Sequence, residues 1–228
     1  FSIQLFDDSS GDSSIVGDYE FSVIDFENAS QTMGIEQFTA SDVYSTNGDF
    51  LINNMNGSVS TSVLNNSDHP YQDNKTYTSI LKRPLIITEA NKNFTYEDMA
   101  ITEPYYDFAI IEASSDLETW VTLDTYDSTR FPEWLDEYYK GTSAIANDNL
   151  FKSQTIVLTD KGFDIGETII LRFSLVTDTY ENSFGWAIKS IEGSVVSIDE
   201  VINDVKVFSV YPTISKGNFT VFGKNALG

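Results

Sequence analysis

Short apolar runs that alternate with polar residues recur along most of this chain. Strict alternation places every second side chain on the same face of an extended strand, which is typical of a strand with one buried face. Polar connections rich in Asn, Asp and Gly separate the runs, as in antiparallel sandwiches and jelly rolls and unlike βαβ units. We therefore expect strands at residues 1–6, 19–24, 75–81, 119–123 and 168–176, and at the longer, more continuous apolar run 105–114.

One segment breaks this pattern. Within residues 131–141, Pro132 and Glu133 suit the first turn of a helix, and Gly141 suits the position just after its end. We predict a short helix inserted between two strands. The expected fold class is therefore all-β: an antiparallel jelly roll or β-sandwich with one short helical insertion, flanked by pieces of neighbouring β domains.

The pattern divides the chain into four parts. Residues 1–24 are expected to form the end of a preceding β domain or an N-terminal hairpin, and residues 25–198 the main jelly roll. Residues 199–204 are predicted to be a linker, and residues 205–228 the incomplete start of a further domain. Because the chain begins in a strand pattern and without Met, we expect an internal piece of a larger protein.

The charge of the chain excludes several classes of function. Asp and Glu number 35 against 13 Lys and Arg, which gives a formal charge of −22, with one His and no Cys. A polyanion of this strength repels nucleic-acid backbones and anionic membrane surfaces. The lack of Cys excludes disulfides, thiolate metal sites and cysteine nucleophiles, and no apolar run has the length of a membrane span. We expect neither nucleic acid as a partner nor a membrane-spanning segment.

Motifs of the main part resemble a known family. Residues 107–123 contain a strand, a Ser-x-Asp turn, a Trp and a second strand, and residues 171–188 contain Leu-Arg-Phe, an Asp and Gly-Trp-Ala-Ile. Together with an opening Phe26-Glu27, these motifs are similar to MAM-like jelly rolls of cleaved adhesins (choice-of-anchor J type) and of immune-inhibitor-A-like peptidases. The resemblance implies a secreted, non-catalytic sandwich that serves adhesion or accessory binding. The chain departs from it at Lys189-Ser190, where the family often has two acids that help to hold structural calcium.

The C-terminal segment resembles a sorting signal. Residues 210–221 are similar to the start of the type A sorting domain of the type IX secretion system of Bacteroidota, although Thr213-Ile214 replaces the usual Asn-Pro. The resemblance implies a secreted or cell-surface protein that binds the outer-membrane export machinery through this segment. A generic strand-turn-strand is the alternative. The signal residues would be Tyr211, Pro212, Gly217 and Phe219.

Calcium is the cofactor that the acidic loops fit best, because hard cations bind several carboxylate and carbonyl oxygens. Asp7, Asp8 and Asp12 share one Gly-containing loop, although without the spacing of an EF-hand. Glu27 would meet Asp178, or Glu181 beside it, if the first and last strands of the jelly roll are neighbours. Two candidate calcium sites are therefore predicted, one at Asp7, Asp8 and Asp12 and the other at Glu27 and Asp178, with ordinary solvated acids as the alternative for each.

Aromatic residues supply the candidate binding surface. Trp134 and Tyr138 share a face of the predicted helix and Tyr139 follows them, so these rings could stack on a glycan or a protein. The alternative is that one aromatic face of the helix caps the sandwich. Trp120 and Trp186 lie in alternating strands and are expected in the core. Tyr105 and Tyr106 flank the start of a strand, so one should point inward and the other outward.

These observations favour a non-catalytic adhesion or accessory binding module of a large secreted surface protein exported by the type IX system. Two alternatives stay open: the accessory C-terminal region of an exported hydrolase, a peptidase, whose catalytic domain lies upstream, or secretion cargo bound to the export machinery. Catalysis within this chain is not expected. The only histidine, His69, precedes Pro70 in a loop without a nucleophile elbow, and no spacing singles out a catalytic pair among the 35 acids.

Overall fold

The computed structural model describes residues 5–6, 13–14, 22–54, 62–192 and 210–211. The chain divides into two units, residues 25–206 and the pair of segments 1–24 and 207–228. In the second unit the described residues form two antiparallel pairs, β1 (Leu5–Phe6) with β2 (Ser13–Ser14) and β3 (Ser22–Val23) with β15 (Val210–Tyr211). The predicted linker lies outside the described residues, as do Asp7, Asp8, Asp12, Pro212, Gly217 and Phe219.

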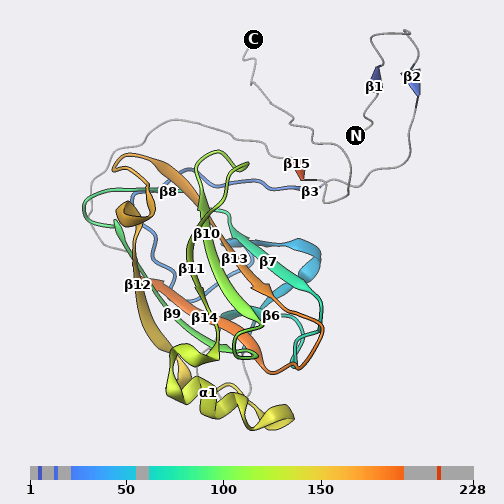
Figure 1. Cartoon of the computed structure of the whole chain (residues 1–228). Coiled ribbons are helices and arrows are strands. Elements are labelled where there is room, and N and C mark those ends of the chain that lie inside the picture. The colour runs from blue at the N-terminus through green and yellow to red at the C-terminus, as the bar shows by residue number, and fades with distance from the viewer. Residues whose placement is uncertain (1–4, 7–12, 15–21, 55–61, 193–209, 212–228) are drawn as a thin grey trace, which may run out of the picture. The chain divides into compact units, whose positions relative to one another are not determined.

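Two antiparallel sheets form the body of residues 25–206, which confirms the prediction of an all-β sandwich (Figure 1). The first sheet contains, in spatial order, β11 (Val121–Tyr126), β10 (Phe108–Ser114), β13 (Thr168–Val176), β7 (Thr76–Leu81) and β4 (Val43–Ser45), and β8 (Leu85–Ile86) also pairs with β13. The second sheet contains β12 (Lys152–Val157), β9 (Asn93–Ile101), β14 (Gly185–Glu192), β6 (Val63–Asn66) and β5 (Phe50–Asn53).

The facing sides of the two sheets form one hydrophobic core, as the alternating pattern requires. Trp186 of β14 is completely buried and meets three other rings edge-on, with centroid distances of 6.1 Å to Phe50, 6.2 Å to Tyr126 and 5.7 Å to Phe173. Burial of each large apolar side chain contributes roughly 1.5–3 kcal/mol. In the first sheet the buried face is lined by Ala109, Ile111, Ala113, Leu171, Phe173 and Leu175.

The chain crosses between the sheets at the end that carries the candidate site. The register pairs Phe108, the first residue of β10, with Val176, the last residue of β13. It also pairs the last residue of β9 with the first residue of β14. Because these strands begin and end side by side, the β9–β10 connection (102–107) and the β13–β14 connection (177–184) meet at one end of the sandwich.

The predicted helical insertion is present as α1 (Pro132–Tyr138), between β11 and β12. It belongs to the same end of the sandwich, because Tyr126 at the end of β11 pairs with Ala109 near the start of β10. Short 3-10 turns complete the described structure: η1 (Thr46–Gly48), η2 (Ser128–Arg130), η3 (Gly141–Ser143), η4 (Asp148–Leu150) and η5 (Leu158–Lys161). Among the described residues, no helix combines the length and the apolar character that crossing a membrane requires.

Candidate cation site

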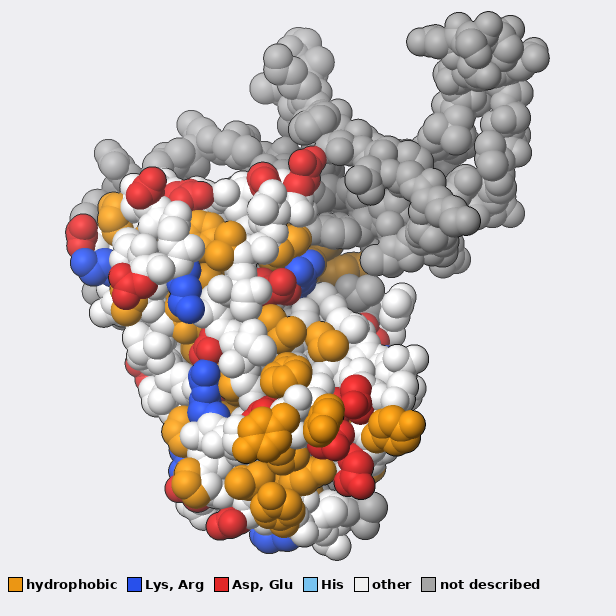
Figure 2. All heavy atoms as spheres, viewed as in Figure 1, with side chains coloured by type: hydrophobic (Ala, Val, Ile, Leu, Met, Phe, Trp, Pro, Cys, Tyr) orange, Lys and Arg blue, Asp and Glu red, His pale blue; other side chains and the backbone are white. Residues whose placement is uncertain are grey.

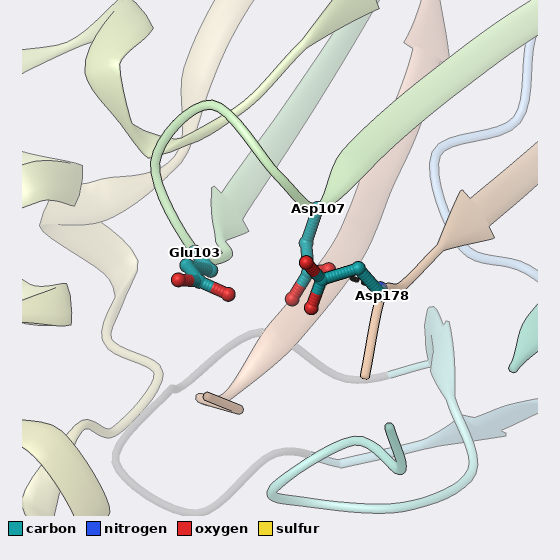
Figure 3. Close-up of side chains that lie close together, drawn as sticks. All are labelled: Glu103, Asp107 and Asp178. Atoms are coloured by element: carbon teal, nitrogen blue, oxygen red, sulfur yellow. Dashed lines mark hydrogen bonds between the residues drawn. The ribbon is translucent and has the colours of Figure 1, made fainter. Parts of the chain in front are cut away.

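Three carboxylates from two connections converge where the chain crosses between the sheets. Glu103 and Asp107 belong to the β9–β10 connection, and Asp178 belongs to the β13–β14 connection. Oxygen atoms of the three side chains lie within 4.8 Å of one another, and Figure 3 shows Asp107 beside Asp178 with Glu103 facing them. Oxygens on opposite sides of a bound calcium ion lie about 5 Å apart. The spacing therefore suits one shared cation.

Hydrogen bonds hold the two connections in this arrangement. The amide of Asp107 donates to the Glu103 carbonyl at 3.2 Å, which closes the first connection into a turn. The amide of Asp178 donates to Asp107 Oδ1 at 2.7 Å, which joins the second connection to the first. The buried Tyr71 hydroxyl donates to Asp107 Oδ2 at 2.5 Å and accepts from the Glu103 amide at 2.9 Å. The Asp107 carboxylate is thus fixed by the protein itself.

The other two carboxylates have fewer hydrogen-bond partners. Asp178 Oδ1 accepts from the Tyr180 amide at 2.8 Å. Glu103 Oε2 is a buried atom that has no hydrogen-bond partner among the described residues. A buried carboxylate oxygen without a donor is costly, by about 1–3 kcal/mol or more. A cation placed between these residues would satisfy it.

The cluster raises the pKa of two of its acids. Burial raises the pKa of Glu103 to about 7, and the charges of Asp107 and Asp178 add to the rise. Burial also raises the pKa of Asp107 to about 6, although hydrogen bonds from Tyr71 and from the Asp178 amide partly offset this rise. Both shifts mean that the surroundings of Glu103 and Asp107 favour the protonated, neutral form of each carboxyl group.

Basic side chains do not compensate this charge within the described part of the chain. The nine ion pairs found there involve other acids. Two further acids, Asp73 and Glu181, lie close enough to raise the pKa of Glu103. A donor set made only of carboxylate oxygens favours hard cations such as Ca²⁺ or Mg²⁺ over zinc or copper.

Asp178 is the predicted metal ligand that the structure places in this cluster, but its predicted partner Glu27 lies elsewhere. The Glu27 carboxylate pairs with Arg83 at 2.7 Å, and its amide donates to the carbonyl of Lys82, just after β7. Asp178 instead follows β13, whose last residue pairs with the first residue of β7. The two acids therefore lie near opposite ends of β7, and the predicted pairing of Glu27 with Asp178 is wrong.

Neither Glu103 nor Asp107 stands out in the sequence pattern. A usable signal is that Asp107 directly precedes one apolar run and Asp178 closely follows another. The start and end of neighbouring antiparallel strands lie together, so these acids meet if the two runs pair. The pairing of β10 with β13 is what the sequence leaves undetermined.

The predicted aromatic surface divides between core and solvent. Trp134 is completely buried, donates from Nε1 to the Leu150 carbonyl at 2.6 Å and packs edge-on against Phe131. It therefore belongs to the core and cannot contact a partner, which corrects its assignment to a binding surface. Tyr138 is half-buried, and Tyr139 is 72% exposed.

Four other aromatic residues test the sequence-based expectations. Tyr105 and Tyr106 are both exposed, because they lie in a turn, where the alternation of a strand does not apply. Trp120 is only half-buried and stacks under the Arg172 guanidinium instead of entering the core. Trp186 lies in the core as predicted.

Comparison with models of known protein families finds none that matches the chain, and comparison with curated proteins finds no match.

Proposed function

We propose that this chain is a non-catalytic β-sandwich module in which Glu103, Asp107 and Asp178 hold a structural calcium ion. The observation that supports the proposal is the convergence of three carboxylates with no basic partner among the described residues. Calcium accepts six to eight oxygens in variable geometry, so carboxylates and waters together can complete its coordination. Magnesium requires a near-ideal octahedron and retains its waters, which makes it the weaker candidate.

A bound calcium ion would act on the two connections that it joins. Its charge would offset the mutual repulsion of the three carboxylates, and its coordination would add a second link to the hydrogen bond between Asp178 and Asp107. Since both connections span the two sheets, the ion would stabilise the whole sandwich.

The test is the melting temperature of the chelated protein with and without added calcium. A ligand at one hundred times its Kd stabilises a folded protein by about 2.7 kcal/mol, which corresponds to roughly 5–10 °C for a protein of this size. We expect a rise of this order with calcium and a smaller one with magnesium. An unchanged melting temperature in millimolar calcium would end the calcium proposal.

Two variants separate a cation site from a merely structural cluster. Glu103→Gln and Asp178→Asn should raise the melting temperature of the chelated protein, because each removes a repelling charge, and should reduce its response to calcium. The matched control is Glu118→Gln, an exposed acid beyond the opposite end of β10. It should change neither value.

The wider role that we propose is adhesion or accessory binding in a secreted surface protein exported by the type IX system. The support for it is the sequence resemblance of the main part to MAM-like jelly rolls and of residues 210–221 to a type A sorting domain. The accessory region of an exported peptidase, or cargo held by the export machinery, remains the alternative. The sequence upstream of the chain distinguishes these, since an H-E-x-x-H helix or a serine triad there would favour the peptidase.

The export step has its own experiment. Co-purification of the chain with an outer-membrane barrel protein should disappear when residues 210–221 are deleted. If the association persists in the deletion variant, that segment is not the signal.

A further inference from the structure

Exposed aromatic residues lie close along the chain to the carboxylates at this end of the sandwich. Tyr105 is 73% exposed, Tyr106 is 60% exposed, and Tyr180 is 73% exposed. The first two lie between Glu103 and Asp107 in the chain, and Tyr180 lies two residues after Asp178. Figure 2 shows hydrophobic and acidic side chains gathered together at the end of the sandwich that carries α1. Large rings left in water at one place mark a surface that can bury them against a partner.

The helical insertion extends the same surface. The Tyr138 hydroxyl at the end of α1 donates to Glu181 Oε2 at 3.3 Å, which brings the helix end against the β13–β14 connection. We define the tyrosine-acid surface by six residues: Tyr105, Tyr106, Tyr180, Glu103, Asp178 and Glu181. Aromatic rings and carboxylates together favour binding of a planar cation such as a guanidinium group.

Five cations of the described residues lie over an aromatic ring and pair with a carboxylate: Lys75, Lys152, Lys189, Arg130 and Arg172. Of these two types of cation, only the planar guanidinium can present a face to the ring and an edge to the carboxylate at the same time. The Arg130 guanidinium lies 4.1 Å from the centroid of Tyr126 and donates two hydrogen bonds, of 2.6 and 2.8 Å, to Asp124. In this arrangement the planar face of the guanidinium stacks on the ring, and the N–H groups at its edge form a bidentate ion pair with the carboxylate.

The second example lies on the first sheet. The Arg172 guanidinium lies 3.9 Å from the centroid of Trp120 and pairs with Glu112 at 2.7 Å. Two of the three arginines of the chain therefore combine an aromatic ring with a carboxylate. The tyrosine-acid surface offers rings and carboxylates without a guanidinium from the described residues.

We propose that the tyrosine-acid surface binds an arginine-bearing segment of a partner protein. The exposed tyrosine rings stack on the guanidinium groups, and the carboxylates accept hydrogen bonds from their edges. The partner is selected by charge complementarity, which also speeds the encounter. Five acids at this end form no ion pair with a basic side chain of the described residues: Asp73, Glu103, Asp107, Asp178 and Glu181. A neutral ligand such as a glycan would leave these charges uncompensated.

The proposal stands on this surface and does not require the calcium ion. A cation in the carboxylate cluster would lower the negative charge of the surface, so arginine-dependent binding should be weaker in calcium than in chelator. The absence of a calcium effect on the melting temperature would end the calcium proposal and leave the peptide measurement in chelator unaffected.

The experiment measures binding of labelled peptides to the full chain by fluorescence anisotropy, in chelator and at about 50 mM salt. The three peptides alternate glycine with arginine, with lysine or with citrulline, which keeps the shape of arginine but not its charge. We expect the arginine peptide to bind, the lysine peptide to bind at least about threefold more weakly, and the citrulline peptide not to bind. Equal binding of the arginine and lysine peptides, or no binding of either, would overturn the proposal.

Protein variants locate the binding site. Tyr180→Ala and Tyr106→Ala should each weaken binding of the arginine peptide by about fivefold or more, as anchor residues of interfaces do. The matched controls lie beyond the opposite ends of β10 and β13: Ile165→Ala removes an exposed apolar side chain, and Glu118→Gln removes an exposed charge. Both controls should bind as the unmodified protein does. The proposal is wrong if both tyrosine variants retain full affinity, or if the controls lose as much affinity as the tyrosine variants.

Discussion

The backbone amide of Asp178 donates a 2.7 Å hydrogen bond to the carboxylate of Asp107, while the side-chain charges of the same two residues repel each other. The residues are 71 positions apart, and the bond joins the two connections that carry the candidate site. Asp107 and Asp178 thus hold the two connections together, and the repulsion between their charges makes the stability of the site depend on protonation. Protonation of the cluster or binding of a cation relieves the repulsion without breaking the bond.

The first prediction concerns the pH dependence of stability in chelator. The pKa of Glu103 is raised to about 7 and that of Asp107 to about 6, so the folded state keeps protons that the unfolded chain releases near its ordinary carboxyl pKa values. These two acids therefore make stability fall as the pH rises from about 4 to about 8, because the folded cluster is forced to ionise. His69, whose pKa burial lowers, contributes a slope of the opposite sign below its ordinary pKa of about 6.5, so the effect of the acids is measured most directly at the upper end of this range. Thermal melts across this range measure the effect, and calcium should reverse most of the loss at the upper end.

A variant assigns this pH dependence to the cluster. The buried Asp98, whose pKa burial raises to about 6, contributes a slope of the same sign, so the unmodified protein alone does not identify the source. Glu103→Gln should flatten the slope above about pH 6, whereas Glu118→Gln should leave it unchanged. A slope above about pH 6 that is as steep in Glu103→Gln as in the unmodified protein would contradict the prediction.

Much of the fold follows from the local pattern, and the site does not. The runs at 75–81 and 168–176 predict β7 and β13 to within a residue, because each is a single run of strand-forming residues bounded by polar connections. The strand β9 is not apparent in the sequence, since its last four residues are all buried and the first of them is the acid Asp98. The cluster depends on strand order and register, which join acids far apart in the chain and which alternation alone does not determine.

The second prediction concerns Gly185, at the start of β14. Its φ is 110°, and a Cβ atom there would lie 2.3 Å from Asn66 Oδ1. That oxygen accepts a 2.7 Å hydrogen bond from the amide of buried Trp186. Gly185→Ala should therefore displace Asn66 and leave a buried amide unpaired. We expect a loss of about 2–4 kcal/mol in the free energy of unfolding, from backbone strain together with the lost hydrogen bond.

Gly166 supplies the control for this prediction. Its φ is 92°, but a Cβ atom there would meet nothing within 4 Å. Gly166→Ala therefore isolates the cost of the left-handed backbone, about 1–2 kcal/mol. Urea unfolding of both variants gives the comparison. Equal losses would mean that the contact with Asn66 contributes nothing.

The last prediction concerns Asp98, a carboxylate buried between the sheets. Its oxygens accept hydrogen bonds from the Tyr126 hydroxyl, from Trp186 Nε1 at 2.7 Å and from the side-chain amide of Gln154. These three donors come from β11, β14 and β12, so one side chain connects both sheets of the sandwich. Burial disfavours its charge, and the three donors compensate for part of that cost.

Asp98→Ala should lower the free energy of unfolding by about 3 kcal/mol or more, because it leaves buried donors without an acceptor. Asp98→Asn keeps one acceptor oxygen but turns an NH₂ group toward a donor, so its loss should be smaller, about 1–3 kcal/mol. Thr95→Ala is the control on the same strand, where a half-exposed hydroxyl bonds to Thr155, and it should cost less than about 1 kcal/mol. Urea unfolding followed by tryptophan fluorescence measures all three. A loss for Asp98→Ala no larger than for Thr95→Ala would show that the carboxylate does not hold the two sheets together.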